Sequence, residues 1–220
     1  MVARVLSVNV GQVRPIASKS GTSGIDKRPV PGPVDIVAPG PKGVGGSGLV
    51  GDAIVDTANH GGNDQAVYAY AREDLDWWEP MVGRPLTSGS FGENLTTELL
   101  DVTGALVGER WQIGDGPRLE VTSPRIPCGT FAVWLNDHGW VKTFRREARP
   151  GAYLRVISPG AVVAGDSIEI VHRPDHDVTM GLMFRALTTE PELMPRLAAA
   201  GDAIHEELRG RVPLADSEPG

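Results

Sequence analysis

The chain of 220 residues is 40% hydrophobic and 22% charged, close to soluble globular averages, and has no apolar run approaching the ~20 residues of a membrane span. Its net charge of −7 argues against a broad nucleic-acid or anionic-membrane surface. A single cysteine excludes an intrachain disulfide, so nothing indicates an oxidising compartment, and the cytoplasm is expected.

The first three quarters of the chain favour short strands and turns, because 28 glycines and 18 prolines interrupt the sequence every few residues. Alternating apolar residues predict a first strand at 1–10 rather than a signal peptide, with Val2, Leu6, Val8 and Val10 on one face. Similar patterns predict strands at 34–37, 66–70, 119–122 and 153–157 and turn-plus-strand units at 106–113 and 162–171. Together these strands predict a β-barrel core.

Helices in this region are predicted to be short, at 72–79, 129–136 and 141–146. After about Pro174, Met and Leu recur at helical spacing and predict three short helices, whose apolar residues pack rather than bind a cofactor. We therefore expect a mainly β protein with short α-helices. It would comprise a β-barrel domain at 1–174, a three-helix appendage at 175–212 and a disordered tail at 213–220.

The segment 48–70 contains a polar loop in which His60 precedes Gly61, Gly62 and Asp64. Glycines let backbone amides approach a ligand closely, and successive amides beside an imidazole form a nest for an anion. A tight turn whose His and Asp cap each other explains the same residues equally well. The segment alone leaves both interpretations open.

A second polar cluster contains Phe91, Gly92, Glu93 and Asn94. The side chains of Glu93 and Asn94 are suited to the donor and acceptor edge of a heterocycle. The same residue types more commonly form turns, because they satisfy local backbone groups. This cluster is therefore a weak indication of a binding site.

The lone thiol, Cys128, follows a Ser-Pro-Arg-Ile-Pro run and precedes an expected helix. The prolines stiffen the approach to the thiol. The helix N-terminus and the positive charge of Arg125 both favour thiolate over thiol. A lone cysteine more commonly packs as a small buried hydrophobe. The rigid, positively charged setting nevertheless predicts that Cys128 is a metal ligand or a nucleophile.

Two other chemistries are less well supported. A cysteine protease requires a general base close to the thiol, and the five histidines, at 60, 138, 172, 176 and 205, lie in no recognisable partner motif. One cysteine and scattered histidines likewise show no paired zinc-ligand spacing. No role is assigned to the histidines other than His60.

The three clusters and their flanks form an ordered set of motifs. In chain order its residues are Ile25, Lys27, Arg28, Pro29, Val30, Gly48, Leu49, Gly51, Asp52, Asp56, His60, Gly61, Gly62, Asp64, Ala66, Val67, Tyr68, Phe91, Gly92, Glu93, Asn94, Leu95, Thr96, Pro124, Arg125, Pro127 and Cys128. This ordered set resembles the MOSC domain, a family named for the C-terminal domain of molybdenum cofactor sulfurases. The resemblance is to its stand-alone bacterial subgroup, which carries a three-helix appendage similar to residues 175–208.

The resemblance implies a β-rich, barrel-like domain that holds a pyranopterin molybdenum cofactor, with Cys128 as the metal ligand. Asp64, Glu93 and Asn94 are candidates for handling protons or orienting the pterin. The residues expected to bind the cofactor are Lys27, Arg28, His60, Gly61, Gly62, Phe91, Gly92 and Arg125.

The family implies reduction of N-hydroxylated substrates, such as hydroxylaminopurines and amidoximes, with electrons from a separate redox protein. The alternative is a non-catalytic carrier of the cofactor, or of a sulfur atom held on Cys128 as a persulfide. Gln65 stands where Lys is common in relatives, and Gly129 and Thr130 stand where a bulky and a basic residue are common. These departures remove positive charge and bear on substrate preference and cofactor affinity. No nucleic-acid or membrane partner is expected, and an oligomer is compatible with the sequence.

Overall fold

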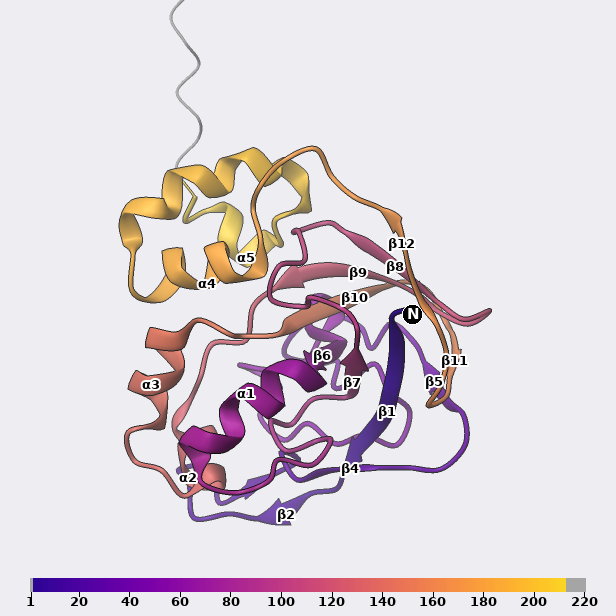
Figure 1. Ribbon diagram of the computed structural model, residues 1–220, viewed down its shortest axis with the longest axis vertical. Coiled ribbons are helices and arrows are strands. Elements are labelled where there is room, and N and C mark those ends of the chain that lie inside the picture. Colours follow the sequence, from indigo (N-terminus) through magenta and orange to yellow (C-terminus); the bar gives the residue numbers. More distant parts are fainter. Residues whose placement is uncertain (1, 213–220) are drawn as a thin grey trace, which may run out of the picture.

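The computed structural model describes residues 2–212 as a curled β-sheet flanked by short helices (Figure 1). Within these residues, eight strands form one mixed sheet: β1 (Arg4–Gly11), β4 (Lys27–Pro29), β6 (Val67–Ala71), β7 (Leu95–Glu98), β8 (Arg110–Ile113), β9 (Arg118–Ser123), β10 (Ala152–Ser158) and β12 (Ile168–His172). Their order is β12-β8-β9-β10-β6-β7-β1-β4, with β6 and β7 parallel and the other neighbours antiparallel. Two small sheets pair β2 (Arg14–Pro15) with β3 (Thr22–Ser23) and β5 (Val34–Ile36) with β11 (Gly160–Val162).

The predicted β-barrel is not closed among the described strands, because the strand order of the sheet is open. One edge of β1 pairs with β7, and its other edge is divided. β4 pairs with the end of β1, while a single bridge joins Arg4 to Ser167, the residue before β12. The backbone N–H of Ile168 also donates to the carbonyl of Ala3 at 2.8 Å. The sheet therefore curls until its ends meet at one point without forming a full ladder.

The face assignment predicted for the first strand is wrong at its start. Val2 is 67% exposed and Leu6 36% exposed, whereas Val5 and Val8 are buried. The pairing of β1 with β7 shifts register between Val5 and Ser7, which is a bulge. One extra residue in a strand moves the side chains before it to the opposite face.

The centre of the sheet positions the loop that carries the second polar cluster. β6 is buried at all five of its residues and lies between β10 and β7. Since parallel strands need a crossover, the chain leaves β6 through helix α1 (Arg72–Val82) and returns into β7. The returning segment, residues 86–94, lies directly before β7 and contains the second polar cluster.

Helices α2 (Gly129–Leu135) and α3 (Trp140–Glu147) pack with α1 around buried aromatic side chains. We call this set the aromatic cluster, and it consists of Tyr70, Trp78, Phe91, Phe131, Trp140 and Phe144. The Phe91 ring lies 5.1 Å from that of Phe131, centroid to centroid, and the Trp78 ring lies 4.7 Å from that of Trp140. Because α2 begins directly after Cys128, burial of Phe131 in this cluster fixes the position of the thiol.

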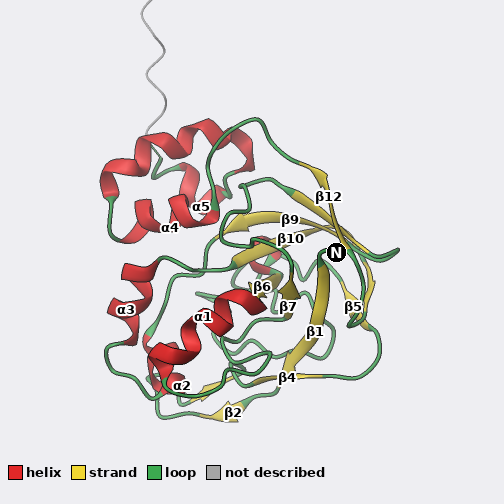
Figure 2. Ribbon diagram, viewed as in Figure 1, coloured by secondary structure: helices red, strands yellow, loops and turns green. Residues whose placement is uncertain are grey.

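The C-terminal part of the described chain is helical (Figure 2): α4 (Met180–Thr188), the 3₁₀ segment η2 (Pro191–Ala203) and α5 (Glu206–Arg209). The hydroxyl of Thr179 caps α4 by accepting the N–H of Leu182 at 3.0 Å. Phe184 of α4 packs against Phe144 of the aromatic cluster at 5.8 Å between ring centroids. The predicted disordered tail, 213–220, lies outside the described residues. In the part of the chain that is described, no helix is long and apolar enough to cross a membrane.

The aromatic cluster offers a test of stability with two neighbouring tryptophans. Trp78 is 0% exposed and donates its ring N–H to the Tyr70 hydroxyl at 2.8 Å, whereas Trp77 is 37% exposed. We expect Trp78→Ala to lower the free energy of unfolding by about 3–5 kcal/mol, since it leaves a large cavity and removes one of the two hydrogen bonds of the Tyr70 hydroxyl, which still donates to the Arg149 carbonyl. Trp77→Ala should cost about 1 kcal/mol, mainly its cation–π contact with Arg149. Urea denaturation followed by circular dichroism measures both, and equal losses would contradict the assignment.

Candidate functional site

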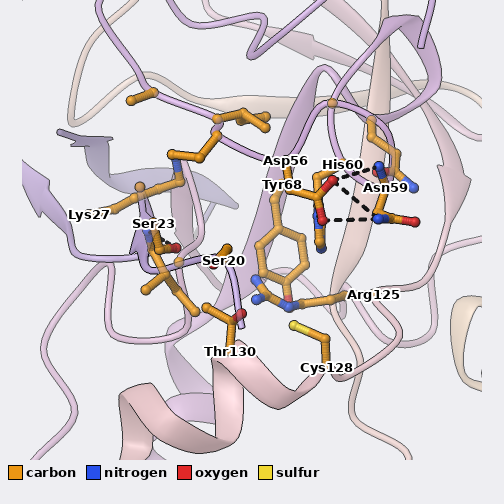
Figure 3. A pocket seen from close by; sticks show the side chains of 18 of the residues that line it. Ser20, Ser23, Lys27, Asp56, Asn59, His60, Tyr68, Arg125, Cys128 and Thr130 are labelled. Carbon is orange, nitrogen blue, oxygen red and sulfur yellow. Dashed lines mark hydrogen bonds and ion pairs between the residues drawn. The ribbon is translucent and has the colours of Figure 1, made fainter. Parts of the chain in front are cut away.

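The residues that the structure describes form a cavity of about 440 Å³ around Cys128 (Figure 3). Its walls come from the loop before β4, the loop containing His60, the strands β6 and β10, and the start of α2. Several residues predicted for the site line this cavity together: Lys27, His60, Gly61, Gly92, Asn94, Arg125 and Cys128. The others, Arg28, Gly62, Asp64, Phe91 and Glu93, do not line it.

Cys128 stands in extended backbone, φ −123° and ψ 171°, immediately before the first turn of α2. Burial opposes ionisation of its thiol. The donor groups of His60, the positive charge of Arg125 and the backbone N–H of Phe131 outweigh this and lower the pKa of Cys128 to about 6. The thiol is therefore mainly thiolate at neutral pH, as the sequence setting suggested. A thiolate is the form that binds a metal or attacks an electrophile.

His60 is brought to Cys128 from 68 positions earlier in the chain. Its Nδ1 lies 3.8 Å from a carboxylate oxygen of Asp56, so the imidazole is near both this carboxylate and the thiol. The general base that sequence motifs did not reveal is thus present in space.

The two glycines after His60 determine the shape of its loop, and the amide of Gly62 is not free to bind an anion. Gly61 and Gly62 both have φ of +79°, a left-handed conformation that favours glycine. A Cβ on Gly62 would lie 2.7 Å from the Lys42 backbone, and the Gly62 N–H donates to the Gly46 carbonyl at 3.1 Å. The Gly62 amide is therefore engaged within the protein, which leaves Gly61 at the cavity wall.

Arg125 is 7% exposed and lies between two aromatic rings. Its guanidinium carbon is 5.1 Å from the Tyr68 ring centroid and 4.5 Å from that of Phe131. One Nη1–H donates to the carbonyl of Phe91 at 2.8 Å. Phe91 therefore supports the site through its backbone and through the aromatic cluster, without lining the cavity.

Glu93 is fully buried behind the cavity. It accepts hydrogen bonds from the backbone N–H of Gly89 at 2.6 Å, the N–H of Phe91 at 2.9 Å and the hydroxyl of Thr96 at 2.9 Å. Burial raises the pKa of Glu93, while these donors act in the opposite direction. Its contacts are those of a carboxylate that fixes the shape of the 86–94 segment.

Lys27 reaches the cavity wall in an ion pair with Asp52, whose side chain is 0% exposed. Asn94 lines the cavity beside this pair and donates to Asp52 Oδ2 at 2.9 Å. Arg28 points away, is exposed and pairs with Asp26 at 3.0 Å. Asp52 was part of the sequence resemblance but received no role, because only the fold shows that it holds Lys27.

Asp64 lies on the far side of the His60 loop, where it pairs with Arg155 at 3.0 Å. It lines a smaller cavity of about 270 Å³ beside His205. Gln65 and Gly61 line both cavities. Thr130, like Gln65 one of the departures from the family pattern, lines the Cys128 cavity. Within residues 2–212, no group of three or more His, Cys, Asp or Glu side chains is arranged to hold a metal ion.

The fold is thus a curled mixed sheet with a thiolate in the wall of a cavity that polar and apolar groups line together. The model of the MOSC domain family matches residues 56–169, which is more than half of the chain, and the protein belongs to this family.

Similar proteins span most of the chain. The uncharacterized protein YflK of Bacillus subtilis is 30% identical over 80% of this chain and 76% of its own length. A reductase of Gibberella moniliformis is 30% identical over 77% of this chain, which spans only 29% of that longer protein. The crystal structure of YiiM from Geobacillus stearothermophilus matches with a TM-score of 0.74 and 26% identity, over 96% of this chain and 97% of YiiM. The fold is thus that of YiiM.

The pKa of Cys128 is directly testable, because it is the only cysteine in the chain. We expect the alkylation rate of cofactor-free protein by iodoacetamide to reach half its maximum near pH 6. His60→Ala removes a donor to the thiolate and should move this midpoint upward by about one to three pH units. His138→Ala, at an exposed position beyond the other end of α2, should leave it unchanged. A midpoint unaffected by His60→Ala would show that His60 does not stabilise the thiolate.

Proposed function

We propose that this protein is a cytoplasmic molybdenum-dependent reductase of N-hydroxylated compounds, of the hydroxylaminopurine or amidoxime type. The cofactor would be a pyranopterin bound in the Cys128 cavity, with Cys128 as the protein ligand of the metal. A separate redox protein would supply the electrons. The observation that carries the proposal is the thiolate of Cys128 at the wall of a polar cavity in a MOSC domain.

The residues of the cavity fit such a cofactor in their chemistry. A thiolate is a soft ligand suited to a redox-active metal. Arg125 has five N–H groups, of which one is given to the Phe91 carbonyl, so others remain for phosphate or pterin oxygens. Gly92 has φ of +73°, and a Cβ there would lie 3.3 Å from Arg125 Nη1, so glycine keeps room beside this guanidinium.

In this proposal the bound cofactor supplies two-electron redox chemistry at its metal. The protein residues do the rest. Cys128 anchors the metal, and Arg125 and His60 stabilise the thiolate and orient polar groups of the ligand. Asn94 presents an amide at the cavity. Its oxygen accepts the Tyr68 N–H, and its NH₂ group donates to Asp52. The positions of Asp64 and Glu93 outside the cavity offer no support for a proton-handling role.

A second candidate function is favoured by one specific observation, the proximity of His60 to both Cys128 and Asp56. Such an arrangement activates a thiol as a nucleophile. The thiolate would attack the outer sulfur of a donor persulfide, release the donor thiolate and hold the sulfur as a Cys128 persulfide. The protein would then carry sulfur for delivery to another enzyme.

Metal analysis of purified protein tests the first candidate. Protein made in a molybdenum-replete host should contain close to one molybdenum atom per chain, measured by inductively coupled plasma mass spectrometry. Cys128→Ser replaces the thiolate by a weak hydroxyl ligand, and the content should fall to about a tenth or less. Val133→Ala, at an exposed position on the same helix, should retain the wild-type content.

The two candidates differ in what the wild-type protein carries. Bound pterin with molybdenum, and turnover of a hydroxylaminopurine with reduced methyl viologen, support the reductase. Protein without pterin whose intact mass shows a labile sulfur on Cys128 supports the carrier instead. A wild-type molybdenum content equal to that of Cys128→Ser would overturn the reductase proposal.

A further inference from the structure

A buried lysine–aspartate pair forms part of the cavity wall and is not explained by metal ligation. The side chains of Lys27 and Asp52 are 8% and 0% exposed, and Lys27 Nζ contacts both oxygens of the carboxylate. Asp52 also accepts the backbone N–H of Gly11 at 2.7 Å and the Asn94 amide at 2.9 Å. An ammonium has three N–H groups. Two of those on Lys27 donate to Asp52, so one remains for the cavity.

The charges around Lys27 suit proton donation better than anion binding. The pair with Asp52 is neutral overall, so Lys27 adds little attraction for a phosphate. Arg125, by contrast, has no carboxylate among the partners that the structure gives it. Burial lowers the pKa of Lys27, Arg125 adds to this, and the carboxylates of Asp52 and Glu93 oppose it. A lysine whose pKa is lowered from its ordinary value is a better proton donor.

Lys19 and Asp56 also line the cavity but are more exposed than Lys27, and the remaining titratable groups are less suited to this task. Arginine does not release its proton. The Tyr68 hydroxyl already donates to the Pro150 carbonyl at 2.8 Å, and burial raises its pKa well above the ordinary value. Burial also raises the pKa of Tyr153. His60 is beside the metal-binding thiol, whereas Lys27 lies across the cavity from Cys128 (Figure 3).

We propose that Lys27 is the proton donor of the reduction and that Asp52 is the residue that positions it. This inference rests on the proposed reductase function. A hydroxylamine R–NH–OH takes two electrons and two protons and gives R–NH₂ and water. The N–O bond breaks as the electrons arrive from the redox protein, and Lys27 gives its proton to the departing oxygen. Nitrogen takes the second proton from solvent, and solvent also reprotonates Lys27.

Two substitutions at Lys27 separate proton donation from charge. With reduced methyl viologen and 6-hydroxylaminopurine, Lys27→Met should lower turnover by about 100-fold or more. Lys27→Arg keeps the positive charge but holds its proton too tightly, so it should be equally slow. Both variants should retain the molybdenum and pterin content of the wild type. Full activity in Lys27→Arg would overturn the role. So would a lower molybdenum content in Lys27→Met combined with a wild-type content in Lys27→Arg, because that result would assign Lys27 to cofactor binding.

Asp52→Asn tests the positioning role through pH. Lys27 acts when protonated, so turnover should fall as pH rises through its pKa. Loss of the Asp52 charge lowers that pKa, and the fall should begin at lower pH in Asp52→Asn. The matched control is Asp74→Asn. Asp74 is a buried carboxylate that pairs with Arg149 at 2.6 Å, and neither residue lines the cavity. It should leave the pH profile unmoved even where it lowers stability.

A direct measurement does not depend on turnover. The Lys27 ¹⁵N resonance in purified, ¹⁵N-lysine-labelled protein should titrate below the ordinary lysine range, and lower still in Asp52→Asn. An ordinary, Asp52-independent titration would overturn the inference while leaving the reductase proposal intact. Wild-type protein without molybdenum would overturn the reductase proposal and this role with it.

Discussion

The buried guanidinium of Arg125 is the constraint on which the site depends. Removing a charge from water is costly unless it finds partners, and Arg125 finds them on three elements. They are the Phe91 carbonyl, the ring of Tyr68 on β6 and the ring of Phe131 on α2. These contacts join the sheet, the 86–94 segment and α2 at one point. Cys128 precedes α2 by one residue, so the same contacts that satisfy the guanidinium also place the thiolate beside it.

Much of the fold could be predicted because hydrophobic periodicity is local. The patterns at 66–70, 119–122 and 153–157 correspond to β6, β9 and β10, and those at 72–79 and 129–136 to α1 and α2. β4 and β7 were not predicted. β4 contains Lys27 and Arg28, and β7 reads Leu-Thr-Thr-Glu, so neither has the alternation of a half-buried strand. Their pairing with β1 comes from tertiary contacts. The sheet stays open because one edge of β1 pairs with β4 at one end and makes only a single bridge to Ser167 at the other. No local sequence pattern encodes this pairing.

The candidate site likewise contains residues that the sequence could predict and contacts that only the fold shows. Cys128 and Arg125 could be predicted because prolines and a helix start act on the residues next to them. The family resemblance also predicted Lys27 and His60 for the site, but not the contacts that they make, since Asp52 is 25 positions from Lys27 and His60 is 68 from Cys128. Residue type also misled at Glu93, because a carboxylate beside glycines has the same sequence signature whether it faces a ligand or local amides. Only burial and the three donors to Glu93 distinguish these roles.

The charged groups at the cavity largely balance one another. Lys27 is matched by Asp52, Arg125 faces the Cys128 thiolate, and His60 is near Asp56. The cavity thus contains several charges but little net charge. Any polar ligand would then be selected by directed N–H groups rather than by long-range attraction. Gln65 and Thr130 are uncharged residues of the cavity wall and leave this balance unchanged.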